Sequence, residues 1–203
     1  MRLDFISPQA SFLQYQIREI VEVAHQVHKL NSAQQIIWEN IGDPIAKGWK
    51  VPLFLKDILE QEIRKPSDGM FGYTHSRGLH TAREWVCQYT KKFAPSSNLQ
   101  PDDVLFSNGL GSAIAALYQM LPDGVRILQP TPAYPTHVSF ESFRHRSEPI
   151  LYRLDPNHNW EPDIQHMEEQ IQAHPEVGGI LLINPNNPTG SVCSKEADRK
   201  SVV

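Results

Sequence analysis

Residues 178–190 read GGILLINPNNPTG and join an apolar run to a loop rich in asparagine and proline. The apolar run, residues 178–184, has the length and composition of a buried strand. The prolines that follow restrict the backbone, and Gly190 permits an unusual dihedral angle, so the loop can present the Asn187 amide in one orientation. We therefore expect a strand that ends in a rigid, polar loop.

Strands and helices alternate along the chain before this loop. The apolar periodicity and the turn signals predict strands at 104–109, 125–130, 148–154 and 178–184, and helices at 112–121, 134–144 and 162–174. Such alternation is typical of an α/β fold, in which helices flank a mostly parallel sheet. Nearer the N-terminus, we expect helices at 11–30, 51–65 and 79–93 and a short strand at 35–44.

The composition narrows the classes of function. The chain has 203 residues, of which 40% are apolar and 21% charged, so it is long enough to bury a core. A formal charge of −4 without charged blocks favours small-molecule partners over nucleic acid or a membrane surface. Cys87 and Cys193 lie far apart and the nine histidines lack zinc-ligand spacing, so we expect no metal site. The start of the chain does not resemble a signal peptide and no run has the length of a membrane span, so we expect a cytoplasmic protein.

Three predicted loops follow predicted strands, at the sheet edge where parallel α/β sheets bind ligands. They are SNGLGS (107–112), PTPAYP (130–135) and NPNNPTG (184–190). Gly109 and Gly111 allow the backbone to approach a phosphate at the start of a helix, although an ordinary tight turn would explain the same residues. Tyr134 is either a flat wall for an aromatic ligand or a core tyrosine. We expect the three loops to converge at one edge of the sheet.

In this order and spacing, the three loops resemble those of the class I and II aminotransferases, which are fold type I pyridoxal-phosphate enzymes. The resemblance extends over residues 35–192, and NPNNPTG is a highly specific motif. It implies that Asn187 places its amide against the phenolic oxygen of pyridoxal 5'-phosphate and that Tyr134 stacks on the pyridine ring. It further implies that the backbone of Gly109, Leu110 and Gly111 holds the cofactor phosphate.

Two positions nearer the N-terminus also resemble the family. Gly42 in NIGDP is similar to the glycine that approaches the substrate carboxylate. Tyr73 in GYTHSRGLHTAREWV is similar to the tyrosine that reaches the cofactor phosphate of the neighbouring subunit, so the resemblance implies a homodimer. Ala82 departs from the family pattern, in which leucine is usual at this position. The arginine that follows in the pattern is present as Arg83. We interpret Ala82 as a change in packing.

The resemblance implies transfer of an amino group between an amino acid and a 2-oxo acid. A carbon–sulfur lyase or a decarboxylase on the same fold is the nearest alternative. A non-catalytic, aminotransferase-like sensor domain is another, but no helix-turn-helix pattern precedes residue 35, which favours an enzyme.

The resemblance also suggests boundaries. We expect an N-terminal helix and arm at residues 1–45 and a partial cofactor-binding large domain at residues 46–197. The family's Schiff-base lysine, pyridine-binding aspartate and carboxylate-binding arginine are expected beyond residue 203, so we expect a C-terminally truncated, inactive fragment whose catalytic residues are unknown. Lys195 is expected to be an ordinary surface residue. Residues 198–203, DRKSVV, resemble a translated sequencing adapter, and we expect them to be a non-native tail.

Overall fold

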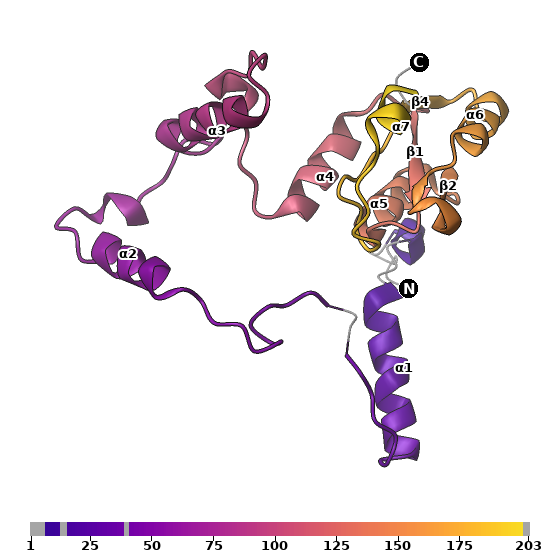
Figure 1. Ribbon diagram of the computed structural model, residues 1–203, viewed down its shortest axis with the longest axis horizontal. Helices are drawn as coiled ribbons and strands as arrows, with labels where there is room; N and C mark the ends of the chain where they lie inside the picture. The colour runs from indigo at the N-terminus through magenta and orange to yellow at the C-terminus, as the bar shows by residue number, and fades with distance from the viewer. Residues whose placement is uncertain (1–6, 13–15, 39–40, 201–203) are drawn as a thin grey trace, which may run out of the picture. The chain divides into compact units, whose positions relative to one another are not determined.

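The structure is a computed structural model that describes residues 7–12, 16–38 and 41–200. The chain divides into two compact units. Figure 1 colours the chain by residue number. The first unit comprises Met1–His25 and Gly109–Val203, and the second comprises Gln26–Asn108. Helix α1 (Gln16–Leu30) contains residues of both units and confirms the C-terminal part of the helix predicted at 11–30, whereas residues 11 and 12 belong to a 3-10 turn.

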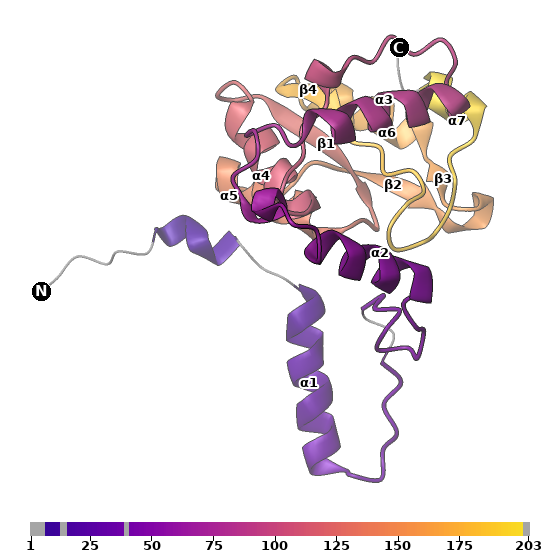
Figure 2. The same cartoon turned by 90° about the vertical axis from the view of Figure 1, so that its left-hand side faces the viewer.

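A four-stranded sheet forms the centre of the first unit. Its strands are β1 (Arg126–Thr131), β2 (Leu151–Asp155), β3 (Glu161–Pro162) and β4 (Val177–Ile180). They lie in the order β3-β2-β1-β4, as Figure 2 shows, and β1 is parallel to both β2 and β4. This confirms the predicted mostly parallel sheet. The short strand β3, antiparallel to β2, was not predicted, because two residues are too few to show a period.

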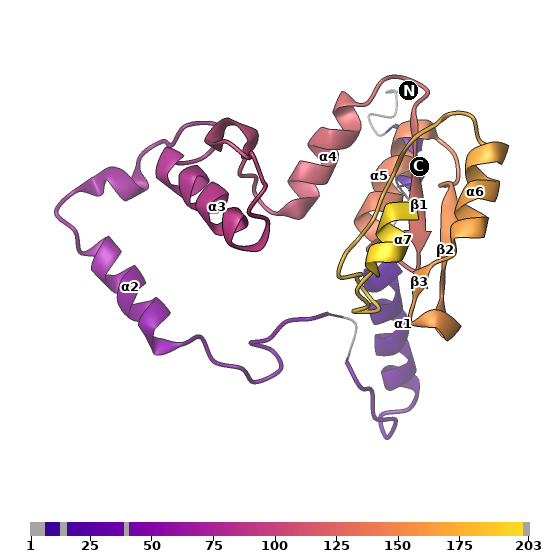
Figure 3. The same ribbon diagram turned by 45° about the horizontal axis from the view of Figure 1, so that its top comes forward.

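Helices lie on both faces of this sheet. They are α4 (Leu110–Met120), α5 (Pro135–His145) and α6 (Ile164–Ala173), all three predicted from the sequence, together with α7 (Lys195–Lys200) and the 3-10 turns η1 (Pro8–Phe12) and η4 (Pro156–His158). Figures 1 and 3 show α6 on one side of the sheet and α4 and α5 on the other.

Two neighbouring residues of β1 explain these layers, since successive side chains of a strand point to opposite faces. Leu128 is fully buried and belongs to one apolar cluster with Tyr152 of β2 and Met167 of α6. Gln129, also fully buried, donates a hydrogen bond to the hydroxyl of Tyr118 on α4 at 3.0 Å. The core of the unit is therefore apolar beneath α6 and partly polar beneath α4 and α5.

The second unit is helical among its described residues. It contains α2 (Leu53–Ile63) and α3 (His80–Phe93), as predicted, and the 3-10 turns η2 (Asp68–Phe71) and η3 (Pro101–Asp103). Arg83 of α3 is buried and donates hydrogen bonds to the carbonyl oxygen of Pro101 at 2.8 Å and to Asp102 at 3.1 Å. This side chain therefore fastens α3 to the turn that follows it.

Two predicted strands are wrong. In the stretch 35–44, the described residues 35–38 and 41–44 contain no strand, and residues 104–109 also form none. A strand needs a neighbour for its backbone N–H and C=O groups, and no strand of the described chain pairs with either stretch. The prediction at 178–184 is too long, because β4 ends at Ile180.

The predicted boundaries at residues 45 and 197 stay predictions. Residues 198–200 of the predicted tail belong to α7, whereas residues 201–203 lie outside the described part of the chain. No helix within the described ranges is long and apolar enough to cross a membrane.

Candidate functional site

Two of the three loops that were expected to converge meet at the carboxyl edge of the sheet, whereas the third, at residues 107–112, does not follow a strand. The first follows β1 and leads through Tyr134 into α5, and the second follows β4 and contains the NPNNPTG motif. The side-chain amide of Asn186 connects them, because it donates to the carbonyl oxygen of Pro132 at 3.4 Å and to the Thr189 hydroxyl at 2.9 Å. Asn186 is buried in this position, with 7% of its surface exposed.

The NPNNPTG loop is held by its own hydrogen bonds. The N–H of Gly190 donates to the carbonyl oxygen of Asn186 at 2.8 Å, and the N–H of Asn186 donates to that of Ser191 at 2.8 Å. Gly190 has a φ of +71°, which a residue with a Cβ rarely adopts. Asn187, at the turn of this loop, is exposed. The loop is therefore a closed turn that directs Asn187 away from the core.

Tyr134 precedes the first residue of α5. Its half-buried ring contacts the ring of His137 edge to face, with 6.4 Å between the centroids. Burial lowers the pKa of His137 below its ordinary value, so the imidazole is neutral at neutral pH. The imidazole beside Tyr134 therefore adds no positive charge. Tyr134 is partly exposed, so it is not a fully buried core residue.

The third predicted loop forms the start of α4. Gly109 caps the helix with a φ of +78°, and the first turn contains no acidic residue. No atom lies within 4 Å of the place where a Cβ on Gly109 or Gly111 would stand. The start of α4, which carries the positive end of the helix dipole, therefore has space beside Gly109 and Gly111.

Gly42 and Tyr73 belong to the second unit. Both are exposed there, Tyr73 completely, and no atom lies within 4 Å of a Cβ built on Gly42. Lys195, at the start of α7, is exposed as predicted.

A groove of about 570 Å³ runs along the loop that follows β1. Its lining includes Phe12, Pro132, Pro135 and Ser142, but neither Tyr134 nor Asn187. This groove is therefore not formed by the residues that the sequence singles out. The described residues also contain no group of three or more metal-ligating side chains.

Comparison with known proteins identifies the family. Residues 45–200 match the family described as aminotransferase class I and II. The chain belongs to this aminotransferase family. The family and its fold imply pyridoxal 5'-phosphate as the cofactor.

Individual aminotransferases are similar over most of this chain. An uncharacterized aminotransferase of Methanocaldococcus jannaschii is 42% identical over 196 residues, which is 97% of this chain and 44% of that protein. The glutamate-pyruvate aminotransferase AlaA of Escherichia coli K12 is 33% identical over 158 residues, or 77% of this chain and 37% of that protein. The structure of an alanine aminotransferase from Pyrococcus furiosus matches with a TM-score of 0.82 and 28% identity, covering 97% of this chain and 48% of that one. The chain thus spans less than half the length of these aminotransferases.

Asn186 joins the two loops of the candidate site, and the sequence analysis missed it. The motif contains two adjacent asparagines, and only Asn187 was singled out. A usable signal was present, because an asparagine followed three residues later by threonine and then by glycine is typical of a turn closed by side chains.

Proposed function

We propose that this chain provides the cofactor-binding part of a pyridoxal-phosphate-dependent aminotransferase, which transfers an amino group between an amino acid and a 2-oxo acid. The observation that carries the proposal is the bond between Asn186 and Pro132, because it brings the loops of Tyr134 and Asn187 together at one edge of the sheet. Membership of the aminotransferase family over residues 45–200 supports the same assignment.

The described residues fit a flat, anionic cofactor. The N-terminus of α4, at Gly109, Leu110 and Gly111, would receive the phosphate on its backbone, since there is space beside both glycines. Tyr134 would stack on the ring, and the exposed amide of Asn187 would donate a hydrogen bond to the phenolic oxygen. Bound pyridoxal phosphate supplies the electron sink for the reaction, and this chain orients it.

The chain's own residues set the surroundings of the reaction. The neutral His137 beside Tyr134 adds no positive charge that would compete with the helix N-terminus for the phosphate. The closed turn of NPNNPTG limits the motion of Asn187, so its amide is oriented before the cofactor binds.

The proposal also includes a substrate pair and a second subunit. Relatives named alanine aminotransferase and glutamate-pyruvate aminotransferase make L-alanine and 2-oxoglutarate the first pair to test. Gly42 would lie near the substrate carboxylate. The fully exposed Tyr73 would reach the phosphate of a second subunit in a homodimer.

Spectroscopy of the full-length protein with added cofactor tests the proposal. We expect a cofactor absorbance band that shifts when L-alanine is added and returns when 2-oxoglutarate is added. A band that never responds to any amino acid would contradict the enzyme and favour a sensor domain. Release of ammonia in place of amino transfer would favour the lyase alternative.

A further inference from the structure

Helices α4 and α5 each begin beside a residue that is proposed to hold the cofactor. Helix α4 starts next to Gly109, and α5 starts next to Tyr134. Both are 11 residues long, so at 1.5 Å per residue their far ends lie about 15 Å from those positions.

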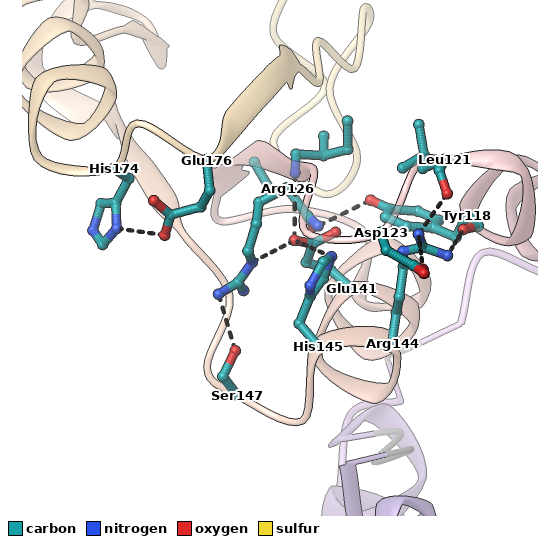
Figure 4. A network of polar contacts seen from close by, with 12 residues as sticks. Tyr118, Leu121, Asp123, Arg126, Glu141, Arg144, His145, Ser147, His174 and Glu176 are labelled. Carbon is teal, nitrogen blue, oxygen red and sulfur yellow. Dashed lines mark hydrogen bonds and ion pairs between the residues drawn. The ribbon is translucent and has the colours of Figure 1, made fainter.

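Arg144 joins the two helices at these far ends. It lies in the last turn of α5 and donates hydrogen bonds to the carbonyl oxygens of Tyr118, at 2.6 Å, and of Leu121, the residue that caps α4 (Figure 4). It donates a further hydrogen bond to the carbonyl oxygen of Pro122, just beyond the helix, at 2.8 Å. The last carbonyl groups of a helix have no partner within the helix, so the guanidinium group satisfies several of them together. Asp123 lies 3.6 Å from Arg144 but is fully exposed, so its ion pair contributes little.

The same end of α5 is hydrogen-bonded to strand β1 of the sheet. Glu141, which is fully buried, accepts hydrogen bonds from the side chain of Arg126 at 2.9 Å and from the N–H of Ile127 at 3.3 Å, both on β1 (Figure 4). Arg126 also donates to Ser147 at 2.9 Å. Arg144 therefore projects from a helix end that is itself held in place.

Helix α4 is consequently held at Tyr118 from two sides. The hydroxyl of Tyr118 receives a hydrogen bond from Gln129 of β1, and its carbonyl oxygen receives one from Arg144. A helix behaves as a rigid rod, so the bond to its carboxyl end also determines where its N-terminus stands. Hydrogen bonds to a phosphate tolerate only a few tenths of an ångström, so a small shift of this N-terminus weakens them.

We infer that Arg144 is a positioning residue for the cofactor phosphate, which acts through α4 without touching the cofactor. The inference rests on the proposed function, since it assigns the phosphate to the N-terminus of α4. It predicts that loss of Arg144 harms the phosphate subsite more than the ring subsite.

Cofactor titrations of the full-length protein separate these effects. The affinities for pyridoxal 5'-phosphate and for pyridoxal, which lacks the phosphate, are measured by fluorescence for the unmodified protein, R144M, R144K and D123N. R144M is expected to bind pyridoxal phosphate about tenfold more weakly, as when one hydrogen bond to a charged group is lost. Its affinity for pyridoxal, which makes no contact with the phosphate subsite, is expected to change by no more than about twofold, as for a distant, independent site. R144K keeps the charge but not the planar fork of donors, so its loss should be intermediate.

D123N is the matched control. It removes the exposed ion pair but leaves the carbonyl oxygens that Arg144 binds, so its affinity for pyridoxal phosphate should equal that of the unmodified protein. Circular dichroism establishes that each variant is folded at the assay temperature, and R144K decides the question if R144M does not fold.

Three results would overturn the inference. They are unchanged affinity for pyridoxal phosphate in folded R144M, an equal loss for both ligands, and a loss in D123N as large as in R144M. If the unmodified protein binds no pyridoxal phosphate, the proposed function fails and this inference fails with it.

Discussion

The amide of Asn186 and the carbonyl oxygen of Pro132 lie 3.4 Å apart, although 54 positions separate the two residues in the chain. This contact joins the loop of Tyr134 to the loop of Asn187. A second hydrogen bond from the same amide, to Thr189, holds the Asn187 loop in its closed form. One buried side chain therefore links the loop of the proposed stacking residue to the loop of the proposed amide donor.

Replacement of Asn186 by alanine tests this dependence. Asn186→Ala removes both hydrogen bonds, so we expect the full-length protein to lose about 1 to 2 kcal/mol of unfolding free energy. We also expect weaker binding of pyridoxal phosphate, because Asn187 is no longer held in one orientation. Denaturant unfolding and cofactor titration measure the two effects. Thr189→Ser keeps the accepting hydroxyl and is the matched control, and wild-type behaviour in Asn186→Ala would contradict the account.

Tyr73 tests the proposed second subunit. Because its side chain is fully exposed within this chain, we expect Tyr73→Phe to leave stability unchanged. It should weaken the binding of pyridoxal phosphate by full-length protein about tenfold, through loss of a hydrogen bond to a charged group. Tyr89→Phe, on α3 of the same unit, is the control. Equal cofactor affinity in Tyr73→Phe and the unmodified protein would count against the assignment.

Asp163 offers a test of the fold that does not involve the site. It caps α6 by accepting the N–H of His166 at 3.0 Å, and this bond, aided by Arg153, holds the pKa of the Asp163 carboxyl below its usual value. Asp163→Ala should therefore cost about 1 kcal/mol of stability at pH 7.

The stability that the Asp163 carboxylate contributes is expected to depend on pH. A carboxyl with a lowered pKa in the folded state contributes stability above its unfolded pKa and loses it as the pH falls through the folded value. The difference between Asp163→Ala and the unmodified protein should shrink below about pH 4. Asp163→Asn keeps a neutral cap, so the cost of this change should be small and should also fall in acid. A difference that is constant from pH 7 to pH 3 would show that the carboxylate is not the stabilising group.

Residues 1–203 expressed alone are expected to be inactive. The family resemblance places the Schiff-base lysine beyond residue 203, and large apolar side chains such as Phe54 and Trp85 are exposed in this chain, which favours self-association. Size-exclusion chromatography and an assay with L-alanine and 2-oxoglutarate measure both properties. Turnover by a monodisperse preparation of these residues would refute the expectation.

The helices were predictable because their periodicity is local. The apolar residues of α4, α5 and α6 recur at helical spacing, and turn residues mark their ends. The failures at 35–44 and 104–109 have a different origin, because a strand depends on a neighbour that no local pattern reveals. Extended, apolar sequence is necessary for a strand but not sufficient.

The loops of the candidate site could be predicted from the sequence, but the side chains that hold these loops and helices in place could not. Gly190 and the prolines of the motif indicate a rigid turn, and the family resemblance supplied the roles of Asn187 and Tyr134. Asn186 and Arg144 escaped notice, because polar side chains are usually exposed. They are buried or partly buried here only because Pro132 and the end of α4 present carbonyl oxygens to them. Such contacts join segments far apart in the sequence and become visible only in the fold.

One measurement tests the central claim most directly. Full-length protein with pyridoxal phosphate is incubated with a mixture of amino acids labelled with nitrogen-15 in the amino group and an unlabelled mixture of 2-oxo acids, and mass spectrometry follows the label. The account predicts that the label appears in the amino acids formed from the 2-oxo acids, in proportion to enzyme and dependent on the cofactor. Label that appears only in ammonia, or that remains in the donors although the cofactor is bound, would contradict it.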